Sequence, residues 1–148
     1  MQHAKSPIVS SLTYAGSLPF VIVALLTIAG IRDLPLVGNI IYVLQTYGLV
    51  IASFMAGTYW GQGIATKEAL PINVYVASNV LVLALWVGFL ISPMKSFIGL
   101  LMIIFPLWLW IDYIFQKQGI ISRSYWTLRF RVTMIVLLAL LTIEYYLI

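Results

Sequence analysis

Long apolar runs separated by short polar breaks make up most of the chain. Five runs stand out, at about residues 11–31, 37–64, 72–91, 97–115 and 127–148. A bilayer core of about 30 Å needs about 20 apolar residues in a helix, so each run is long enough to cross it. These continuous runs lack the alternation of membrane barrel strands. The pattern therefore predicts an all-α polytopic membrane protein, a compact bundle of five transmembrane helices.

The polar breaks are too short to hold a folded domain outside the membrane. Each contains a few charged residues or prolines, such as Arg32, Asp33 and Pro35 after the first run. Residues 1–148 are therefore predicted to form a single integral-membrane domain. The first run is too long for a cleavable signal peptide and has no small-residue cleavage site before Arg32, so we expect it to be retained.

Composition excludes several classes of protein. The chain is 63% hydrophobic and 8% charged, whereas a soluble domain carries about 25% charged residues. It has no cysteine and one histidine, His3, so neither a thiolate site nor a haem or zinc site with several histidine ligands can form within one chain. We expect no metal and no cofactor. The net charge of +4 is explained by membrane orientation and calls for no nucleic acid.

Lysine and arginine set the predicted orientation. With five spans, the N-terminal tail and the second and fourth connections share one side of the membrane. That side holds Lys5, Lys67, Lys117, Arg123, Arg129 and Arg131, and the other side holds Arg32 and Lys95. Since basic residues concentrate on the cytoplasmic side, the N-terminus is predicted to be cytoplasmic and the C-terminus outside.

Small residues recur every four positions in the second run. Ser53, Gly57, Gly61 and Ala65 form one helical stripe, with Gly48, Ala52 and Ala56 on the neighbouring stripe. Small residues at this spacing let two helix backbones approach closely in lipid. The first stripe is interpreted as a helix-packing surface at the centre of the bundle. An oligomer interface and a ligand-facing surface are the alternatives.

Aromatic and polar side chains gather near the cytoplasmic end of the same run. Tyr59 and Trp60 are followed by Gln62 and preceded by Thr58. Aromatic residues at this depth usually belong to the interfacial belt. A small-molecule pocket with an aromatic lid is the alternative.

Asp112 is the most informative acidic residue. It lies near the cytoplasmic boundary of the fourth run, at the depth where Arg129 and Arg131 open the fifth. The two arginines point about 160° apart on a helix. One is therefore expected to pair with Asp112 and the other to reach lipid phosphate. A structural ion pair is the first interpretation, and a proton or anion relay and a headgroup site are the alternatives.

Short motifs over about residues 12–140 resemble a bacterial domain-of-unknown-function family that includes mitochondrial transmembrane protein 69. They are Tyr14-Ala15-Gly16, Leu18-Pro19-Phe20, Ser53-Phe54 with Gly57, Trp60-Gly61, Asp112, and Tyr125 with Leu128-Arg129-Phe130-Arg131. The resemblance implies a five-helix, multi-pass protein of the bacterial inner membrane and brings no activity with it. Where the family pattern has histidine before the Trp-Gly pair, this chain has Tyr59, so no role of that histidine carries over.

Three functions are compatible with these features. Asp112 and Glu144 lie at opposite depths and cannot form a paired-carboxylate site, which needs about 5–10 Å, so the protein is predicted not to be an enzyme. The first hypothesis is an accessory or assembly subunit of a larger membrane complex. It would act through helix packing with a membrane-protein partner or with a second copy. The alternatives are an oligomeric channel or transporter lined by Thr58, Gln62, Asn73, Asn79 and Asp112, and a quinone- or lipid-binding protein.

Overall fold

Helices account for all five apolar runs. The computed structural model describes residues 7–66, 70 and 72–147. Within them lie α1 (Pro7–Ala15), α2 (Leu18–Ile28), α3 (Ile40–Ala65), α4 (Val74–Ile91), α5 (Met94–Lys117) and α6 (Arg123–Leu147). With α1 and α2 taken together, five segments are long and apolar enough to cross a membrane. The expected helical bundle is confirmed in this part of the chain, and the five segments indicate a multi-pass membrane protein.

Polar capping residues explain why some helices begin where hydropathy does not place them. The last run was predicted from residue 127, but α6 begins at Arg123. The hydroxyl of Ser122 accepts a hydrogen bond from the backbone N–H of Tyr125 at 3.1 Å. Asn39 caps α3 in the same way, accepting from the N–H of Ile41 at 3.0 Å. A polar residue that satisfies a free N–H starts a helix although it lowers local hydropathy.

The first apolar run is broken into two helices near Gly16. Pro19 lies in the first turn of α2, where its missing N–H costs no helical hydrogen bond. The Ser17 hydroxyl donates to the carbonyl of Tyr14 at 2.7 Å, which holds the turn. The hydroxyl of Tyr47 on α3 donates to the carbonyl of Gly16 at 3.0 Å. A hydrogen bond therefore connects the break in the first span to the second span.

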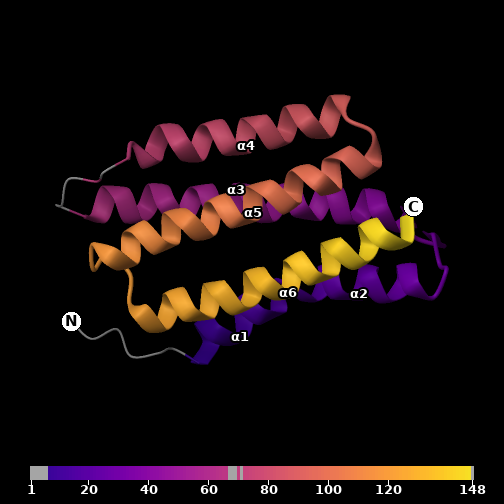
Figure 1. Ribbon diagram of the computed structural model, residues 1–148, viewed down its shortest axis with the longest axis horizontal. Coiled ribbons are helices and arrows are strands. Elements are labelled where there is room, and N and C mark those ends of the chain that lie inside the picture. The colour runs from indigo at the N-terminus through magenta and orange to yellow at the C-terminus, as the bar shows by residue number, and fades with distance from the viewer. Residues whose placement is uncertain (1–6, 67–69, 71, 148) are drawn as a thin grey trace.

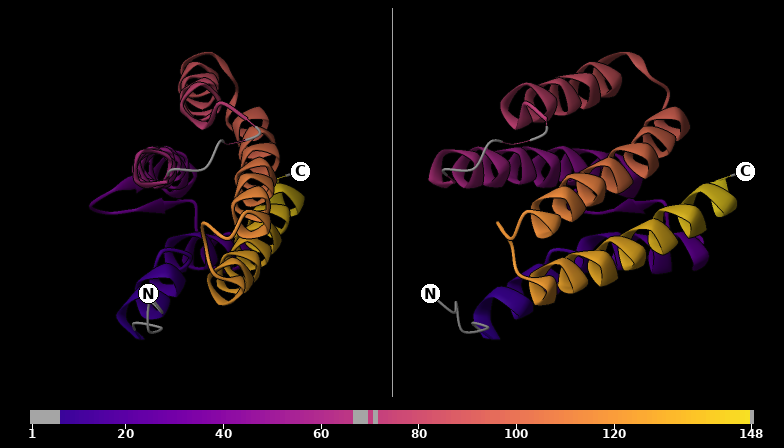
Figure 2. Two further views of the ribbon diagram at one scale, coloured as in Figure 1. Left: turned by 90° about the vertical axis from the view of Figure 1, so that its left-hand side faces the viewer. Right: turned by 60° about the vertical axis from the view of Figure 1, so that its left-hand side comes forward.

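A small antiparallel hairpin joins α2 to α3, a feature that the sequence pattern did not predict. Its strands are β1 (Asp33–Leu34) and β2 (Gly38–Asn39), with Asp33 opposite Asn39. Gly38 has φ +73°, a conformation that favours glycine. The hairpin projects sideways from the bundle (Figure 2), and Leu36 at its tip is 98% exposed.

The helices form a bundle in which α5 occupies the middle. It contacts α3 and α4 on one side and α6 on the other, and α6 also packs against α2 and α1. Helix α4 therefore lies at one edge of the bundle, and α1 and α2 lie at the opposite edge (Figures 1 and 2). In Figure 1 α1 begins in the left half of the molecule, and α6 ends near its right-hand end.

The buried face of α3 carries the close helix contacts. Gly48, Ala52, Met55, Tyr59 and Gly63 recur on this face and are all buried. A Cβ added to Gly48 would lie 2.9 Å from the Cδ1 of Leu101 on α5, closer than two side chains tolerate. The stripe that contains Gly48 and Ala52 is thus the one that packs inside the bundle.

The stripe of Ser53, Gly57, Gly61 and Ala65 faces outward, so its interpretation as the centre of the bundle is wrong. All four residues are exposed, and a Cβ added to Gly57 or Gly61 would meet nothing within 4 Å. Residues four apart share a helix face, but the spacing does not say which of two small-residue faces turns inward. The larger buried residues Met55 and Tyr59 accompany the inward one.

Candidate functional site

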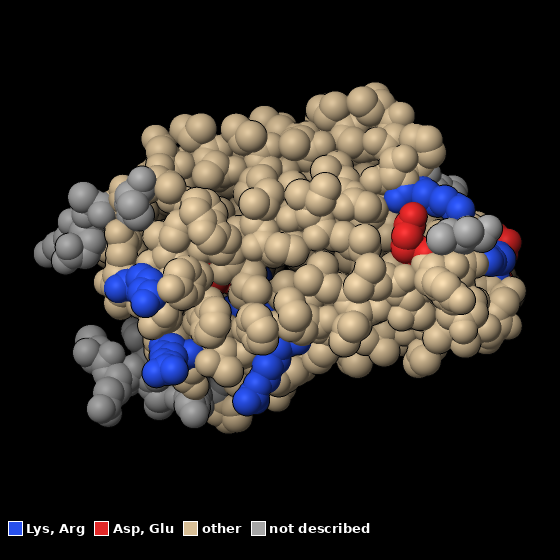
Figure 3. Space-filling view, viewed as in Figure 1, with Lys and Arg blue, Asp and Glu red and all other residues tan. Residues whose placement is uncertain are grey.

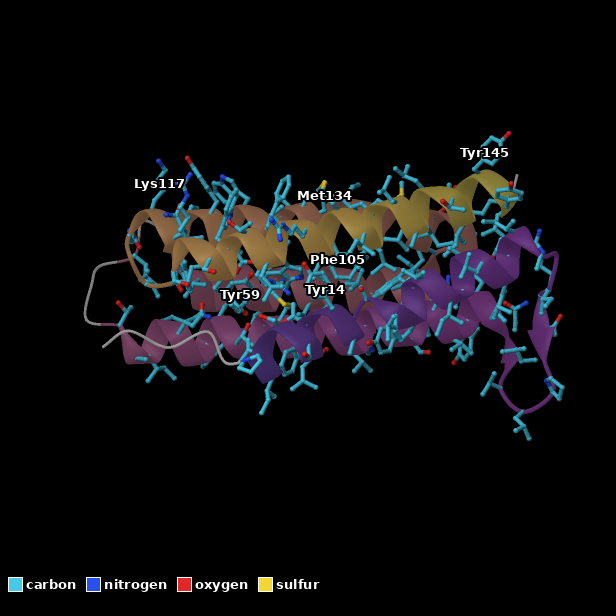
Figure 4. The ribbon with its side chains drawn as sticks, turned by 90° about the horizontal axis from the view of Figure 1, so that it is seen from below. Tyr14, Tyr59, Phe105, Lys117, Met134 and Tyr145 are labelled. Atoms are coloured by element: carbon cyan, nitrogen blue, oxygen red, sulfur yellow. The ribbon has the colours of Figure 1, made fainter. Side chains whose placement is uncertain are left out.

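Three helices bring polar side chains together in the interior near the α5–α6 connection. The hydroxyl of Tyr59 on α3 donates to Oδ1 of Asp112 on α5 at 2.8 Å. The Nε of Arg129 on α6 donates to Oδ2 of the same carboxylate at 3.1 Å. Asp112 is 1% exposed. In Figure 4 Tyr59 lies between the ribbons, in the half of the molecule that carries Lys117 and far from Tyr145.

Aromatic packing holds Tyr59 in position. Its ring stacks on Trp108 of α5, with centroids 5.0 Å apart and an interplanar angle of 18°. The edge of Phe115 meets the same ring at 5.8 Å. The hydroxyl also lies 3.0 Å from the carbonyl oxygen of Trp108, a second acceptor for its proton. Trp108, Asp112 and Phe115 share one face of α5. This face therefore contacts both the ring and the hydroxyl of Tyr59.

The pairing of Asp112 with one arginine agrees with the expectation from the sequence. Arg129 is the inward partner, with its side chain 13% exposed, and Arg131 is exposed. Within the described residues this is the only ion pair. Both carboxylate oxygens already accept a donor, so the cluster joins α3, α5 and α6 through one buried charge. Removing one member of such a pair leaves an uncompensated charge in the interior.

The two aromatic residues expected in an interfacial belt near the end of α3 differ in exposure. Trp60 is 41% exposed, and its ring meets that of Tyr75 on α4 edge-on at 5.1 Å. Tyr59 is fully buried, so its assignment to the belt is wrong. The Oε1 atom of Gln62 is buried without a hydrogen-bond partner among the described residues.

A cavity of about 320 Å³ lies beside the polar cluster. Residues of α1, α3 and α6 make most of its wall, and Phe20 of α2 and Phe105 of α5 contribute. Arg129 and Tyr125 line it together with the hydroxyl-bearing Thr13, Thr58 and Thr133. The sequence analysis did not assign Tyr125 to a site. Its spacing of four from Arg129 on one helix face was the available signal.

The remaining polar candidates do not join this cavity. The side chain of Asn79 donates to the carbonyl of Tyr75, and that of Asn73 caps its own helix by accepting from Val76. Both asparagines are exposed. No group of three or more His, Cys, Asp or Glu side chains that could hold a metal ion occurs in the described ranges.

Comparison with known proteins identifies one family. The sequence profile of a family described as "Protein of unknown function (DUF3429)" matches residues 6–144. No curated protein and no solved structure matches the chain significantly.

Proposed function

Because the chain belongs to the DUF3429 family, whose description assigns no activity, we propose its function from its own geometry. We propose that it is a non-catalytic membrane protein that acts through helix packing. It serves as an accessory or assembly subunit of a larger membrane complex. A helix of that complex packs on the outward stripe of α3, formed by Ser53, Gly57, Gly61 and Ala65.

The exposure of this stripe is the observation that carries the proposal. Gly57 and Gly61 lie one turn apart on the outward face, with open space where a side chain would stand. Acyl chains cover any apolar surface, so a face that contacts only lipid gains nothing from small residues. A partner helix does gain, because close backbone approach increases van der Waals contact where no hydrophobic effect drives helices together.

The buried ion pair supports a structural role for the charged residues. Asp112 accepts hydrogen bonds from Tyr59 and Arg129 on both oxygens. A general base must lie within hydrogen-bond reach of the proton that it removes, but Asp112 is buried between helices and does not line the neighbouring cavity. The carboxylate is instead part of the contact between α3, α5 and α6, as expected of a protein that works as a scaffold.

The distribution of charge supports the orientation that we propose. Among the described residues, Lys117 ends α5 and Arg123 and Arg131 lie in the first part of α6, whereas Arg32 and Asp33 follow α2 and Lys95 lies at the start of α5. In Figure 3 blue Lys and Arg atoms lie in the left half of the visible face and again at its right-hand end, where red Asp and Glu atoms accompany them. Lys5 and Lys67, which the prediction also used, lie outside the described residues. Following the positive-inside rule, we place the N-terminus in the cytoplasm and the C-terminus outside. The membrane is the bacterial inner membrane, and we extend the relationship to mitochondrial transmembrane protein 69.

A pull-down from native membranes tests the proposal. The tagged protein, extracted in polymer nanodiscs, is expected to recover a different membrane protein at stoichiometric level. Gly57→Leu and Gly61→Leu fill the space on the stripe and should abolish this recovery without changing the melting temperature.

Gly99→Leu is the matched control. Gly99 is a glycine of α5 whose added Cβ also meets nothing within 4 Å, so the partner should still be recovered. Recovery of no stoichiometric partner, or of a second copy of the chain alone, contradicts the accessory role.

A further inference from the structure

The cavity beside the polar cluster combines one polar end with apolar walls. Its volume of about 320 Å³ is at the lower end of small-molecule pockets. Arg129 and Tyr125 lie one turn apart on α6 and bring the polar groups to one end. Phe54 and Met55 of α3 and Val132 of α6 contribute to the apolar wall. Such a division fits a molecule with a polar head and an apolar tail.

The polar end offers hydrogen-bond donors that the described residues leave without acceptors. Arg129 uses its Nε for Asp112, and neither of its terminal nitrogens has a hydrogen-bond partner in the described ranges. The hydroxyl of Tyr125 likewise bonds to no described residue. A ligand that supplies acceptor oxygens would satisfy these groups, which a partly buried site otherwise leaves unpaired.

The neighbouring carboxylate selects against an anionic headgroup, and the Arg129 guanidinium selects against a cationic one. Asp112 lies 3.1 Å from Arg129, so the pair contributes no net charge to the cavity. An anion bound to the same guanidinium would lie close to the carboxylate and be repelled by it in a medium of low dielectric constant. An uncharged acceptor, such as a carbonyl oxygen, has no such cost.

Exposed residues of α1 and α3 in the cavity wall indicate an opening that would face lipid in a membrane. Leu12 of α1 and Phe54 of α3 line it and are 67% and 68% exposed. Helix α1 contributes no buried residue to the bundle and packs mainly on α6. A headgroup and the first part of one tail fill the available volume, and the rest of the tail continues among the acyl chains.

We propose that this cavity binds a single-tailed amphiphile whose uncharged headgroup presents carbonyl oxygens to Arg129 and Tyr125. Lipid quinones and monoacylglycerols share this chemistry. Phe54 of the cavity wall lies beside Gly57 on α3. The inference concerns a small ligand and its test uses no partner protein, so it stands or fails separately from the proposed subunit role.

Titration of the purified protein with three amphiphiles of equal tail length tests the proposal. The ligands are a decyl-substituted benzoquinone, monodecanoylglycerol and decyl phosphate, and native mass spectrometry measures binding. We expect saturable one-to-one binding of the benzoquinone, the acylglycerol or both, and the tighter ligand identifies the source of the headgroup. Decyl phosphate binding as tightly as either, or no saturable binding of both carbonyl ligands, overturns the proposal.

Two variants test whether the ligand binds in this cavity. Tyr125→Phe removes a hydroxyl that makes no hydrogen bond to a described residue and should weaken binding about three- to tenfold, with little change in the melting temperature. Thr13→Phe adds a ring from α1 and should weaken binding more than about tenfold. Thr142→Phe is its control, because both hydroxyls donate to the carbonyl four residues earlier, and Thr142 lies outside the cavity.

Binding that both Tyr125→Phe and Thr13→Phe leave unchanged overturns the site. A loss of binding in Thr142→Phe equal to that in Thr13→Phe overturns it as well. If Thr13→Phe does not fold, Tyr125→Phe decides alone, because it keeps the ring and removes only a hydroxyl that makes no hydrogen bond to a described residue.

Discussion

The hydroxyl of Tyr59 donates to Asp112 at 2.8 Å across a separation of 53 residues in the chain. Since Arg129 occupies the other carboxylate oxygen, the second, fourth and fifth spans meet at one buried acid. Asp112 is therefore a junction between three helices. The side chains that donate hydrogen bonds to it should contribute more to stability than side chains that do not contact it.

Replacing Tyr59 with phenylalanine is expected to lower the melting temperature in detergent. The ring keeps its stacking on Trp108, but the carboxylate loses one donor. Hydrogen bonds to charged groups contribute about 1.5–3 kcal/mol, so the shift should be several degrees. Tyr145→Phe, at a tyrosine that is 72% exposed, should leave the melting curve unchanged. Equal shifts in the two variants would contradict the junction.

The two arginines at the start of α6 should respond very differently to replacement by glutamine. Arg129→Gln leaves Asp112 without its counter-charge and should destabilise the protein by about 3 kcal/mol or more. Arg131→Gln changes an exposed side chain and should cost less than about 0.5 kcal/mol. Thermal unfolding of both variants in the same detergent measures the difference. A larger effect at Arg131 would show that the wrong arginine has been placed inside.

Gly48 of α3 and Gly99 of α5 differ in the space available for a side chain. Gly48→Leu forces a side chain against Leu101, which is fully buried, and overpacking of this kind costs about 1–3 kcal/mol. Gly99→Leu enters open space and should be tolerated. Melting temperatures of the two variants provide the comparison. A tolerant Gly48 would mean that α3 and α5 lie farther apart than described.

The topology can be read with single cysteines, because the natural chain has none. Leu36→Cys in the β hairpin should react with an impermeant maleimide added outside the cell. Lys117→Cys at the end of α5 should react only after the membrane is permeabilised. Both positions are exposed, so a cysteine that fails to react lies on the side of the membrane away from the reagent. Labelling of both from one side would contradict the odd number of crossings between them.

The number of long apolar segments was predictable because each span must be apolar along its length. The break near Gly16 was not, since Ser17 and Pro19 interrupt hydropathy too little to divide a run. The hairpin around Leu36 was missed because its short paired strands leave no pattern in the sequence.

The ion pair of the candidate site was predictable because the chain has few charged residues that could form it. A buried carboxylate such as Asp112 needs a cation at its own depth, and Arg129 and Arg131 open the last span at that depth. The partner hydroxyl of Tyr59 was not predictable, because a tyrosine near a membrane boundary fits the interfacial belt equally well. The outward direction of Gly57 and Gly61 was missed for a similar reason, since two small-residue stripes have the same spacing.

The packing of α2 against α6 has a consequence for biogenesis. The ribosome completes the first span long before its main neighbour exists, while α3, α4 and α5 can each pack on the span that precedes them. During this interval Asp112 also lacks Arg129, which arrives with the last span. The bundle closes only when translation reaches the C-terminal helix, so a chain truncated before α6 would present quality-control proteases with an acid without its counter-charge and a first span without its main neighbour.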